Sequence, residues 1–252
     1  MAFKALLIAN RGEIAIRIAR AAADLGLRTV AVFSEDDEHC LHTRIADEAC
    51  ALTGLGASAY LDADALIAAA KDLGCDAIHP GYGFLSEQAD FARHCGEQGI
   101  TFIGPQVKHL ALFGDKARAR KAAIAADVPV LKGIDQAVTV SQASAFMESL
   151  GNDRAIMIKA LAGGGGRGSA PVTDPGQLEA IFERCQREAM AAFGLAEVYV
   201  EEFVERARHV EVQILGDLSG KVSHLGEREC SIQRHNQKLI EVAPASNLSA
   251  TM

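Results

Sequence analysis

Ala155-Ile-Met-Ile-Lys159 is an apolar, strand-like run that ends in a lysine, and the glycine-rich stretch Ala162-Gly-Gly-Gly-Gly-Arg-Gly168 follows after two residues. Backbone without side chains can approach polyphosphate oxygens closely, and Lys159 and Arg167 place positive charge on both sides of the glycines. We interpret this stretch as a nucleotide-phosphate loop.

The residues around the glycines decide which kind of phosphate loop this is. Gly163, Gly165 and Gly168 satisfy the spacing G-x-G-x-x-G, but a dinucleotide fingerprint requires a helix at the last glycine, whereas Ser169-Ala-Pro171 follows here. No G-x-x-x-x-G-K-[ST] string occurs in the chain, which excludes a Walker-type loop. The sequence therefore predicts a strand, a glycine loop and a second strand, forming a hairpin flap. A solvated glycine linker is the alternative.

Composition limits the classes of partner and compartment. The chain has 252 residues, 25 Lys and Arg against 33 Asp and Glu, and a formal net charge of −8, which disfavours nucleic acid or an anionic membrane as partner. The apolar run Ala5–Ala9 breaks at Asn10, too soon for a signal or membrane segment. Six cysteines without a C-x-x-C pair indicate reduced thiols. We expect a cytoplasmic protein, with an organellar matrix as the alternative.

The first part of the chain alternates strands with helices, which is typical of a parallel sheet wrapped by helices. The pattern predicts an α/β domain over residues 1–110, followed by a linking region over residues 111–132. The linking helix itself is expected near Val107–Ala126. The elements expected in the first domain are strands at Phe3–Ala9, Thr29–Phe33, Ala77–His79 and Thr101–Ile103, and helices at Ile14–Leu25, Ala63–Leu73 and Phe91–Gln98.

The pattern changes after Pro129. We expect a helix at Val140–Leu150, the glycine hairpin, and a helix from about Gln177 to Phe193. Val198–Phe203 is expected to open a new set of strands. Apolar and polar residues then alternate from Val210 to Ile214, as in a half-buried strand, and a turn at Asp217–Gly220 leads into a returning strand from Val222 to about Glu227.

Six strings in this order resemble biotin carboxylase, a family of ATP-grasp enzymes. They are Ile8-Ala-Asn-Arg-Gly-Glu-Ile14, His79-Pro-Gly-Tyr-Gly-Phe-Leu-Ser-Glu87, Gly114-Asp-Lys116, the glycine loop after Lys159, Arg208-His-Val-Glu-Val212 and Glu227-Arg-Glu-Cys-Ser-Ile-Gln-Arg234. The resemblance implies a Rossmann-like (pre-ATP-grasp) amino-terminal domain, an ATP-grasp lid over residues 133–203, and the start of a truncated ATP-grasp body over residues 204–252.

The resemblance also implies a reaction, that of an ATP-dependent ligase. Biotin, arriving on a carrier domain or protein, would be carboxylated by bicarbonate through carboxyphosphate, with ATP and Mg²⁺ (or Mn²⁺) as cofactors. A biotin carboxylase region of an acyl-CoA carboxylase, working with a carboxyltransferase component and possible as a homodimer when full-length, is the expected context. A pyruvate or urea carboxylase is the alternative.

The family motifs imply site residues. Lys116 and Lys159 would contact the nucleotide, Gly165 and Gly166 would close over its phosphates, and Glu201, Glu202, Phe203 and Val204 would hold adenine, partly through backbone groups. His209 and Gln233 would lie on the ribose side and Asn236 would be a further nucleotide contact. Lys238 would be the catalytic residue on the bicarbonate side.

Several of these residues also have a structural interpretation. A lone helix lysine such as Lys116 is usually solvated, and a lone strand histidine such as His209 usually serves a structural hydrogen bond; the family match favours the nucleotide. Cys230 is expected to pack rather than react, because nothing in the sequence indicates a lowered thiol pKa. For Arg11 and Glu13, at the end of the first strand, we prefer a structural ion pair over ligand binding.

In the family, the acidic metal ligands lie beyond the position of Met252, so the sequence predicts no metal ligand within this chain and no activity of the chain alone. An unpaired sheet edge near residues 239–252 is expected for the same reason. Another ATP-grasp ligase is disfavoured by the joint presence of the strings His79–Glu87 and Glu227–Lys238. A non-catalytic ATP-binding fragment stays an alternative.

Overall fold

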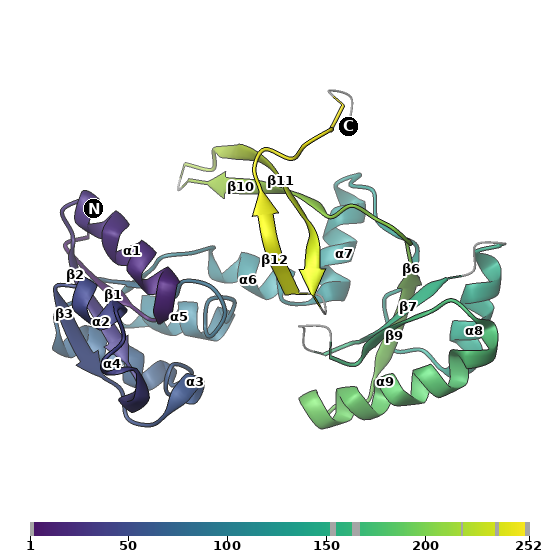
Figure 1. Cartoon of the computed structure of the whole chain (residues 1–252), viewed down its shortest axis with the longest axis horizontal. Coiled ribbons are helices and arrows are strands. Elements are labelled where there is room, and N and C mark those ends of the chain that lie inside the picture. Colours follow the sequence, from purple (N-terminus) through teal and green to yellow (C-terminus); the bar gives the residue numbers. More distant parts are fainter. Residues whose placement is uncertain (1–2, 152–154, 163–166, 218, 235–236, 250–252) are drawn as a thin grey trace. The chain divides into compact units, whose positions relative to one another are not determined.

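A computed structural model of the chain describes residues 3–151, 155–162, 167–217, 219–234 and 237–249. The chain divides into two compact units, Met1–Ala119 and Arg120–Met252. Among the described residues there are three separate sheets, one in the first unit and two in the second (Figure 1). None of the described helices is both long and apolar enough to cross a membrane.

The first unit is built on a five-stranded parallel sheet, as the alternation of strands and helices predicts. Its strand order is β3-β2-β1-β4-β5, with every neighbouring pair parallel. The edge strand β3 is short and mostly exposed, and it was not expected. The strands are β1 (Ala5–Ile8), β2 (Arg28–Phe33), β3 (Glu48–Ala51), β4 (Ala77–His79) and β5 (Thr101–Phe102).

Helices cover both faces of this sheet. Successive residues of β1 point to opposite faces, so Ile8 packs against α1 (Gly12–Asp24), whereas Leu7 packs against α4 (Ala63–Asp72) and α5 (Ala89–Glu97). Both side chains are fully buried, which stabilises the sheet by about 1.5–3 kcal/mol for each. Shorter helical segments complete the unit: η1 (Glu35–Asp37), α2 (His42–Ile45) and α3 (Gly56–Ala59).

The linking segment holds two helices rather than the single helix that was predicted. α6 (Val107–Phe113) ends at Gly114, and α7 (Lys116–Ala125) begins two residues later. The carboxylate of Asp115 accepts a hydrogen bond of 2.9 Å from the backbone N–H of Arg118 and so caps the second helix. A glycine followed by a capping aspartate therefore interrupts a continuous apolar pattern.

The glycine hairpin belongs to a four-stranded antiparallel sheet with the order β6-β9-β7-β8. The expectation that Val198–Phe203 opens a new set of strands is wrong, because β9 lies between β6 and β7 in this sheet. β6 and β9, the first and last strands of this region, pair with each other, so the order of strands along the chain does not predict the order in the sheet. The elements are β6 (Gly133–Ile134), α8 (Val140–Ser149), β7 (Ile156–Ala160), β8 (Ser169–Val172), η2 (Pro175–Gln177), α9 (Leu178–Phe193) and β9 (Val198–Glu202).

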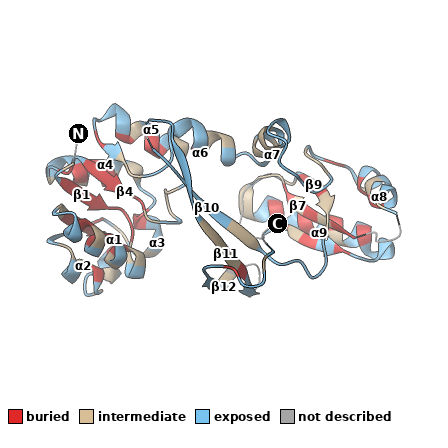
Figure 2. Ribbon diagram, turned by 90° about the horizontal axis from the view of Figure 1, so that it is seen from above, coloured by how far each residue is buried: buried red, intermediate tan, exposed pale blue. Residues whose placement is uncertain are grey.

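Helices cover one face of this sheet, and the other, which we call the open face, is partly exposed. Ile156 and Ile158 of β7 are fully buried and join a core with Met147 of α8 and Phe182 of α9 (Figure 2). Because side chains alternate along a strand, Lys159 lies on the opposite face. α8 and α9 thus cover one face of the sheet, whereas the face that carries Lys159 also carries the buried Tyr199 and is exposed only in part.

The two predicted strands that flank the glycines are confirmed by the pairing of β7 with β8, and residues 163–166 between them lie outside the described residues. Lys159 lies opposite Ser169, and Met157 lies opposite Pro171. Proline cannot donate to a ladder, and β8 is an edge strand, where such a residue is tolerated. Gly168 closes the described part of the hairpin: its carbonyl accepts a hydrogen bond of 2.9 Å from the backbone N–H of Ala160.

The third sheet is antiparallel and consists of β10 (Val210–Gly216), β11 (Val222–Arg234) and β12 (Gln237–Val242). The predicted turn is present, since Gly220 N–H donates to the Asp217 carbonyl. The expected half-burial of β10 is wrong: Val212 and Ile214 are each 53% exposed, because this sheet carries no packed apolar layer among the described residues. β12 pairs with β11 and forms one edge of the sheet, in the region where an edge was expected.

Gly168 provides a test of the hairpin. Its backbone is left-handed (φ +64°), and an added Cβ would lie 3.1 Å from the Cβ atoms of both Ala160 and Ala189. Gly168→Ala should therefore lower the free energy of unfolding by about 2–4 kcal/mol, through backbone strain and overpacking together. Urea unfolding measures the change.

The matched control is Gly194→Ala. Gly194 is also left-handed (φ +74°), but nothing lies within 4 Å of its added Cβ. Only the backbone cost of about 1–2 kcal/mol is expected there. Equal losses at the two positions would contradict the close packing of the hairpin base.

Candidate functional site

The open face of the hairpin sheet carries an ion pair between two residues predicted to bind nucleotide. Tyr199 lies opposite Lys159, and Glu201 lies opposite Met157, so Lys159 and Glu201 are diagonal neighbours on one face. The ammonium of Lys159 donates to the Glu201 carboxylate. Their side chains are 32% and 17% exposed. A cation held at the base of the glycine loop is suited to an anionic ligand, which would compete with Glu201 for it.

Further polar groups border this face. Tyr199 lies in the same row, and burial raises the pKa of its phenol to about 12, so the ring is neutral at physiological pH. Arg120 and Asp135, which follows β6, form an ion pair of 2.7 Å with side chains 18% and 34% exposed. The face therefore combines a neutral aromatic ring with paired charges.

The segment predicted to hold adenine continues from β9. The backbone N–H of Glu202 donates to the Lys132 carbonyl at 2.8 Å, and that of Phe203 donates to the Ala155 carbonyl at 3.0 Å. Two backbone N–H groups of this segment thus donate to carbonyl groups of other segments of the same chain. Val204 follows outside the strand and is 46% exposed.

Three predicted residues lie outside the described part of the chain, and a fourth belongs to the other compact unit. Gly165, Gly166 and Asn236 lie outside the described residues. Lys116 is exposed at the first position of α7 and belongs to the first compact unit, whereas the other described candidates belong to the second.

The predicted ribose residues His209 and Gln233 are in contact. The side-chain amide nitrogen of Gln233 lies 2.9 Å from His209 Nδ1 and donates at 3.0 Å to the Cys230 carbonyl. Since an amide nitrogen is a donor, Nδ1 accepts, and the ring proton of a neutral imidazole is on Nε2. The backbone N–H of His209 also donates to Ser231 Oγ at 2.8 Å. The imidazole is therefore oriented on one side by Gln233.

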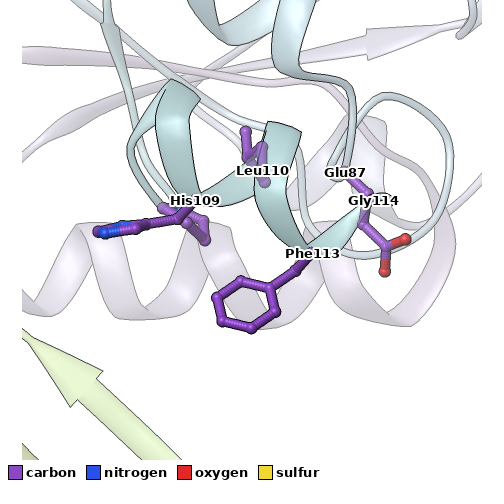
Figure 3. A pocket seen from close by; sticks show the side chains of 6 residues that line it. Glu87, His109, Leu110, Phe113 and Gly114 are labelled. Atoms are coloured by element: carbon purple, nitrogen blue, oxygen red, sulfur yellow. The ribbon is translucent and has the colours of Figure 1, made fainter. Parts of the chain in front are cut away.

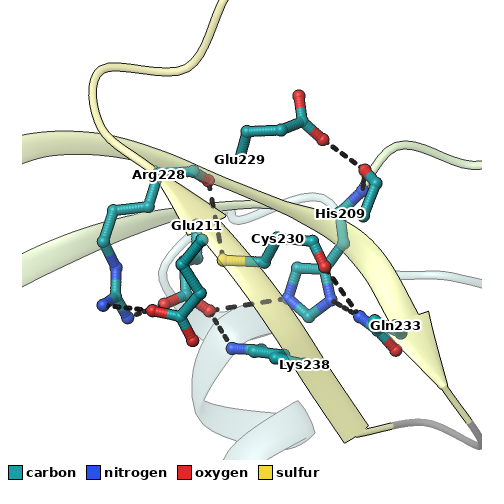
Figure 4. Close-up of polar contacts among 9 residues, drawn as sticks. His209, Glu211, Arg228, Glu229, Cys230, Gln233 and Lys238 are labelled. Atoms are coloured by element: carbon teal, nitrogen blue, oxygen red, sulfur yellow. Dashed lines mark hydrogen bonds and ion pairs between the residues drawn. The ribbon is translucent and has the colours of Figure 1, made fainter.

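Lys238, predicted on the bicarbonate side, belongs to a ladder of charges across β10, β11 and β12 (Figure 4). It donates to Glu211, which also accepts from Arg228, and Arg228 donates at 2.8 Å to Glu241. The hydrogen bond from Lys238, together with that from Arg228, lowers the pKa of Glu211 to about 2, and the hydrogen bond to Glu211 raises the pKa of Lys238. Both partners are charged at neutral pH.

Sequence reasoning gave no function to Glu211 and Arg228. Both lie in strings that resemble the family, and alternation along β10 places Glu211 on the same face as His209. Their contact with each other and with Lys238 depends on strand pairing: Glu211 lies opposite Arg228, and Lys238 lies opposite Gln233. Spacing along the chain does not reveal this register.

Cys230 is fully buried, as a packing role requires, and burial raises the pKa of its thiol. Its sulfur and the carboxylates of Glu211 and Glu241 lie within 4.8 Å of one another. They do not fit Mg²⁺, which prefers oxygen ligands, because the thiol is protonated and each carboxylate already pairs with Arg228. We assign no metal to this group, and the location of the metal ligands outside this chain stays a prediction.

The expected ion pair between Arg11 and Glu13 is wrong. Arg11 instead pairs with Asp37 at 3.0 Å, and its guanidinium lies 5.6 Å and 6.0 Å from the ring centres of Tyr60 and Phe84. Burial of the Asp37 carboxyl disfavours its charge, but hydrogen bonds from Tyr60 and Arg11 outweigh burial and lower its pKa to about 2. Cation–π contact and a more buried carboxylate compete better for the guanidinium than Glu13 does.

The loop after β4 is fastened to the turn after β1. The side-chain amide of buried Asn10 donates to the carbonyls of Pro80 and Tyr82 at 2.6 and 2.8 Å, and the Tyr82 hydroxyl donates to Glu13. An added Cβ on Gly81 would lie 2.7 Å from the Asn10 amide nitrogen. Ligands of open parallel sheets lie at such strand ends.

A hollow of about 270 Å³ lies beside α6 in the first unit (Figure 3). The carboxylate of Glu87 and the rings of His109 and Phe113 surround it. It contains none of the predicted nucleotide residues. Its lining is Glu87, Pro105, His109, Leu110, Phe113 and Gly114.

Two family models match the chain. Residues 2–110 match the biotin carboxylase N-terminal domain, and residues 115–252 match the ATP-binding domain of the carbamoyl-phosphate synthase L chain.

Individual relatives agree with these matches. The chain is 50% identical to pyruvate carboxylase of Staphylococcus aureus over 99% of its length, and 48% identical to biotin carboxylase of a Nostoc species over 100%. It spans 22% of the first and 56% of the second relative. The structure superposes with a TM-score of 0.92 and 44% identity on the biotin carboxylase domain dimer of Hydrogenobacter thermophilus 2-oxoglutarate carboxylase, solved with MgADP, ADP and bicarbonate, covering 100% of this chain and 55% of that one.

The depressed pKa of Glu211 predicts a pH dependence of stability. A carboxyl with a pKa of about 2 when folded and about 4.5 when unfolded adds stability that is fully present above about pH 4.5 and is lost as the pH falls toward 2. The urea midpoint of the wild type should therefore exceed that of Glu211→Gln at pH 6, and the difference should shrink steadily between pH 5 and pH 2.

Glu205→Gln is the control, because Glu205 lies on the exposed turn before β10. Its difference from the wild type should stay near zero. A Glu211 difference that does not vary over this pH range would contradict the charge ladder.

Proposed function

Since the chain belongs to the biotin carboxylase family, we propose that it provides the nucleotide-binding part of an ATP-dependent ligase that carboxylates biotin with bicarbonate. The observation that carries this proposal is the pairing of Lys159 with Glu201 on the open face of the hairpin sheet. A glycine loop attached to that face is suited to cover a polyphosphate.

We propose that the Lys159 ammonium leaves Glu201 in part to contact nucleotide phosphates, with Lys116 as a second cation and Gly165 and Gly166 over the phosphates. Adenine would lie against Glu201, Glu202, Phe203 and Val204. Because the N–H groups of Glu202 and Phe203 donate within the protein, backbone recognition falls to Val204 and to carbonyl groups of the segment. The edge of adenine offers both a donor and an acceptor to such groups.

The contact between His209 and Gln233 supports a ribose site at the start of β10, because His209 holds the Gln233 amide in place and an amide oxygen suits a sugar hydroxyl. Asn236 is retained as a further nucleotide contact. Lys238 would hold bicarbonate, whose negative charge suits a protonated ammonium.

The proposed chemistry begins with phosphoryl transfer. An oxygen of bicarbonate attacks the γ-phosphorus of ATP, the bond to the β-phosphate oxygen breaks, and ADP leaves. Carboxyphosphate then yields phosphate and CO₂, and the ureido nitrogen of biotin forms a bond to CO₂ as its proton passes to the released phosphate. Such transfer depends on placed cations rather than on a protein nucleophile, and Mg²⁺ would neutralise charge on the phosphates.

The partners are proposals of the same kind. Biotin would arrive on a carrier domain or protein, and a carboxyltransferase would use the carboxybiotin. The related 2-oxoglutarate carboxylase domain is a dimer, which supports a homodimer here.

An acyl-CoA was the expected final acceptor, but a pyruvate carboxylase fits equally well, because pyruvate carboxylases are among the relatives of the chain. Carboxylation assays of the native enzyme with acetyl-CoA, propionyl-CoA, pyruvate and 2-oxoglutarate would separate these acceptors. Location in the cytoplasm stays a prediction.

Loss of the Lys159 charge should weaken ATP binding. Lys159→Gln is expected to raise the Kd for ATP about 10- to 100-fold, because hydrogen bonds to charged groups are worth about 1.5–3 kcal/mol. Isothermal titration of the chain with ATP measures this change.

Lys221→Gln is the matched control, since Lys221 is an exposed lysine beside the β10–β11 turn. Its Kd should stay within about twofold of the wild type, because screened surface charges contribute little. An unchanged Kd in Lys159→Gln would exclude the hairpin face as the phosphate site.

A non-catalytic ATP-binding fragment is the second candidate, because the chain spans 56% of the biotin carboxylase that it matches. Bicarbonate-dependent ATP cleavage with free biotin distinguishes the two. We expect the native enzyme to show this activity and the 252-residue chain alone to bind ATP without it. Robust turnover by the isolated chain would contradict the second expectation, and its absence from the native enzyme would contradict the first.

A further inference from the structure

Both carboxylate oxygens of Glu211 are bound by cations from other strands. Oε1 accepts from the guanidinium of Arg228, and Oε2 accepts from the ammonium of Lys238 (Figure 4). Oε2 also lies 3.5 Å from Nε2 of His209. The side chain of Glu211 is 25% exposed, so water screens these contacts only in part.

The sheet itself builds this arrangement. Glu211 and Arg228 are direct cross-strand partners in the β10–β11 pair, and Lys238 reaches the same carboxylate from β12. Arg228 is fixed from its other side by Glu241 at 2.8 Å. The ion pair between Arg228 and Glu241 therefore holds Arg228 in place, and Arg228 in turn holds the Glu211 carboxylate that binds Lys238.

A lysine needs such a partner in order to hold a small anion at a defined point. Its four-carbon stem carries about 2 kcal/mol of rotamer entropy, and its ammonium has no directional fork of its own. Glu211 restricts that freedom by accepting one of its three N–H bonds, and no other hydrogen bond from this ammonium is found among the described residues.

The Glu211 carboxylate also faces His209, the residue proposed to contact the ribose. Gln233 donates to His209 Nδ1, so the proton on Nε2 points toward Glu211. One side chain thus contacts the lysine assigned to bicarbonate and the histidine assigned to ribose.

We propose that Glu211 is a positioning residue that fixes the Lys238 ammonium for bicarbonate and secondarily orients His209 for the nucleotide. This inference rests on the proposed function. Glu211 touches neither substrate and acts through these two neighbours.

The test uses Glu211→Gln in the native enzyme, with KM measured for bicarbonate and for ATP. Loss of the charge releases the Lys238 ammonium, so the KM for bicarbonate should rise about tenfold or more. The KM for ATP should rise less, by about threefold, because the His209 contact is longer. Glu211→Asp, which keeps the charge, should fall between the wild type and Glu211→Gln.

Glu241→Gln is the matched control, because Glu241 belongs to the same ladder but pairs with Arg228 alone among the contacts found for it. Both of its KM values should stay within about threefold of the wild type. In a Lys238→Gln background, Glu211→Gln should add less than about twofold to the KM for bicarbonate, since the two residues act as a unit.

Two results would overturn the inference. One is an equal effect of Glu211→Gln and Glu241→Gln on the KM for bicarbonate; the other is a full additional loss of Glu211→Gln in the Lys238→Gln background. If Lys238→Gln raises that KM and Glu211→Gln does not, only this inference fails. If neither substitution affects bicarbonate-dependent ATP cleavage, the proposed function fails with it.

A measurement on the wild type keeps the inference testable if Glu211→Gln does not fold. Competitive acetylation of lysines should label Lys238 more slowly than Lys221, because Glu211 keeps its ammonium protonated and occupied. Equal labelling rates would overturn the contact on which the inference depends.

Discussion

The cross-strand pairing of β7 with β9 is the constraint on which the candidate site depends. It sends Ile156 and Ile158 into the core beneath α8 and α9 and, by the same alternation, sends Lys159 and Glu201 to the open face. A shift of one residue in this register would bury the lysine and expose the core, which the apolar layer forbids. The packing energy of the sheet therefore fixes where the charged pair lies.

The fold was predictable where periodicity is long and uninterrupted. α1, α4 and α9 lie within a few residues of their expected positions, and the flanks of the glycine loop indicated the hairpin of β7 and β8. The errors have physical causes. Gly114 and Asp115 end one helix and cap the next inside an otherwise continuous pattern, and β9 joins the earlier sheet through contacts with β6 and β7 that lie far away in sequence.

The sequence proposed individual site residues, whose roles stay predictions, but it did not predict the contacts among them. The family motifs pointed to Lys159, Glu201, His209 and Gln233, and the structure brings them together in two pairs. Arg11 was paired with its sequence neighbour Glu13, whereas the folded chain offers it Asp37 and two aromatic rings. The contacts of Glu211 and Arg228 depend on the strand register, which no spacing in one sequence supplies.

The central claim is that ATP binds on the open face of the hairpin sheet. Hydrogen–deuterium exchange of the chain with and without MgATP tests it most directly. The account predicts slower exchange, on adding MgATP, in peptides that cover residues 156–172 and 198–204, with α8 and its buried face unchanged. Protection confined to the first unit, or no protection in these two segments at a saturating nucleotide concentration, would contradict it.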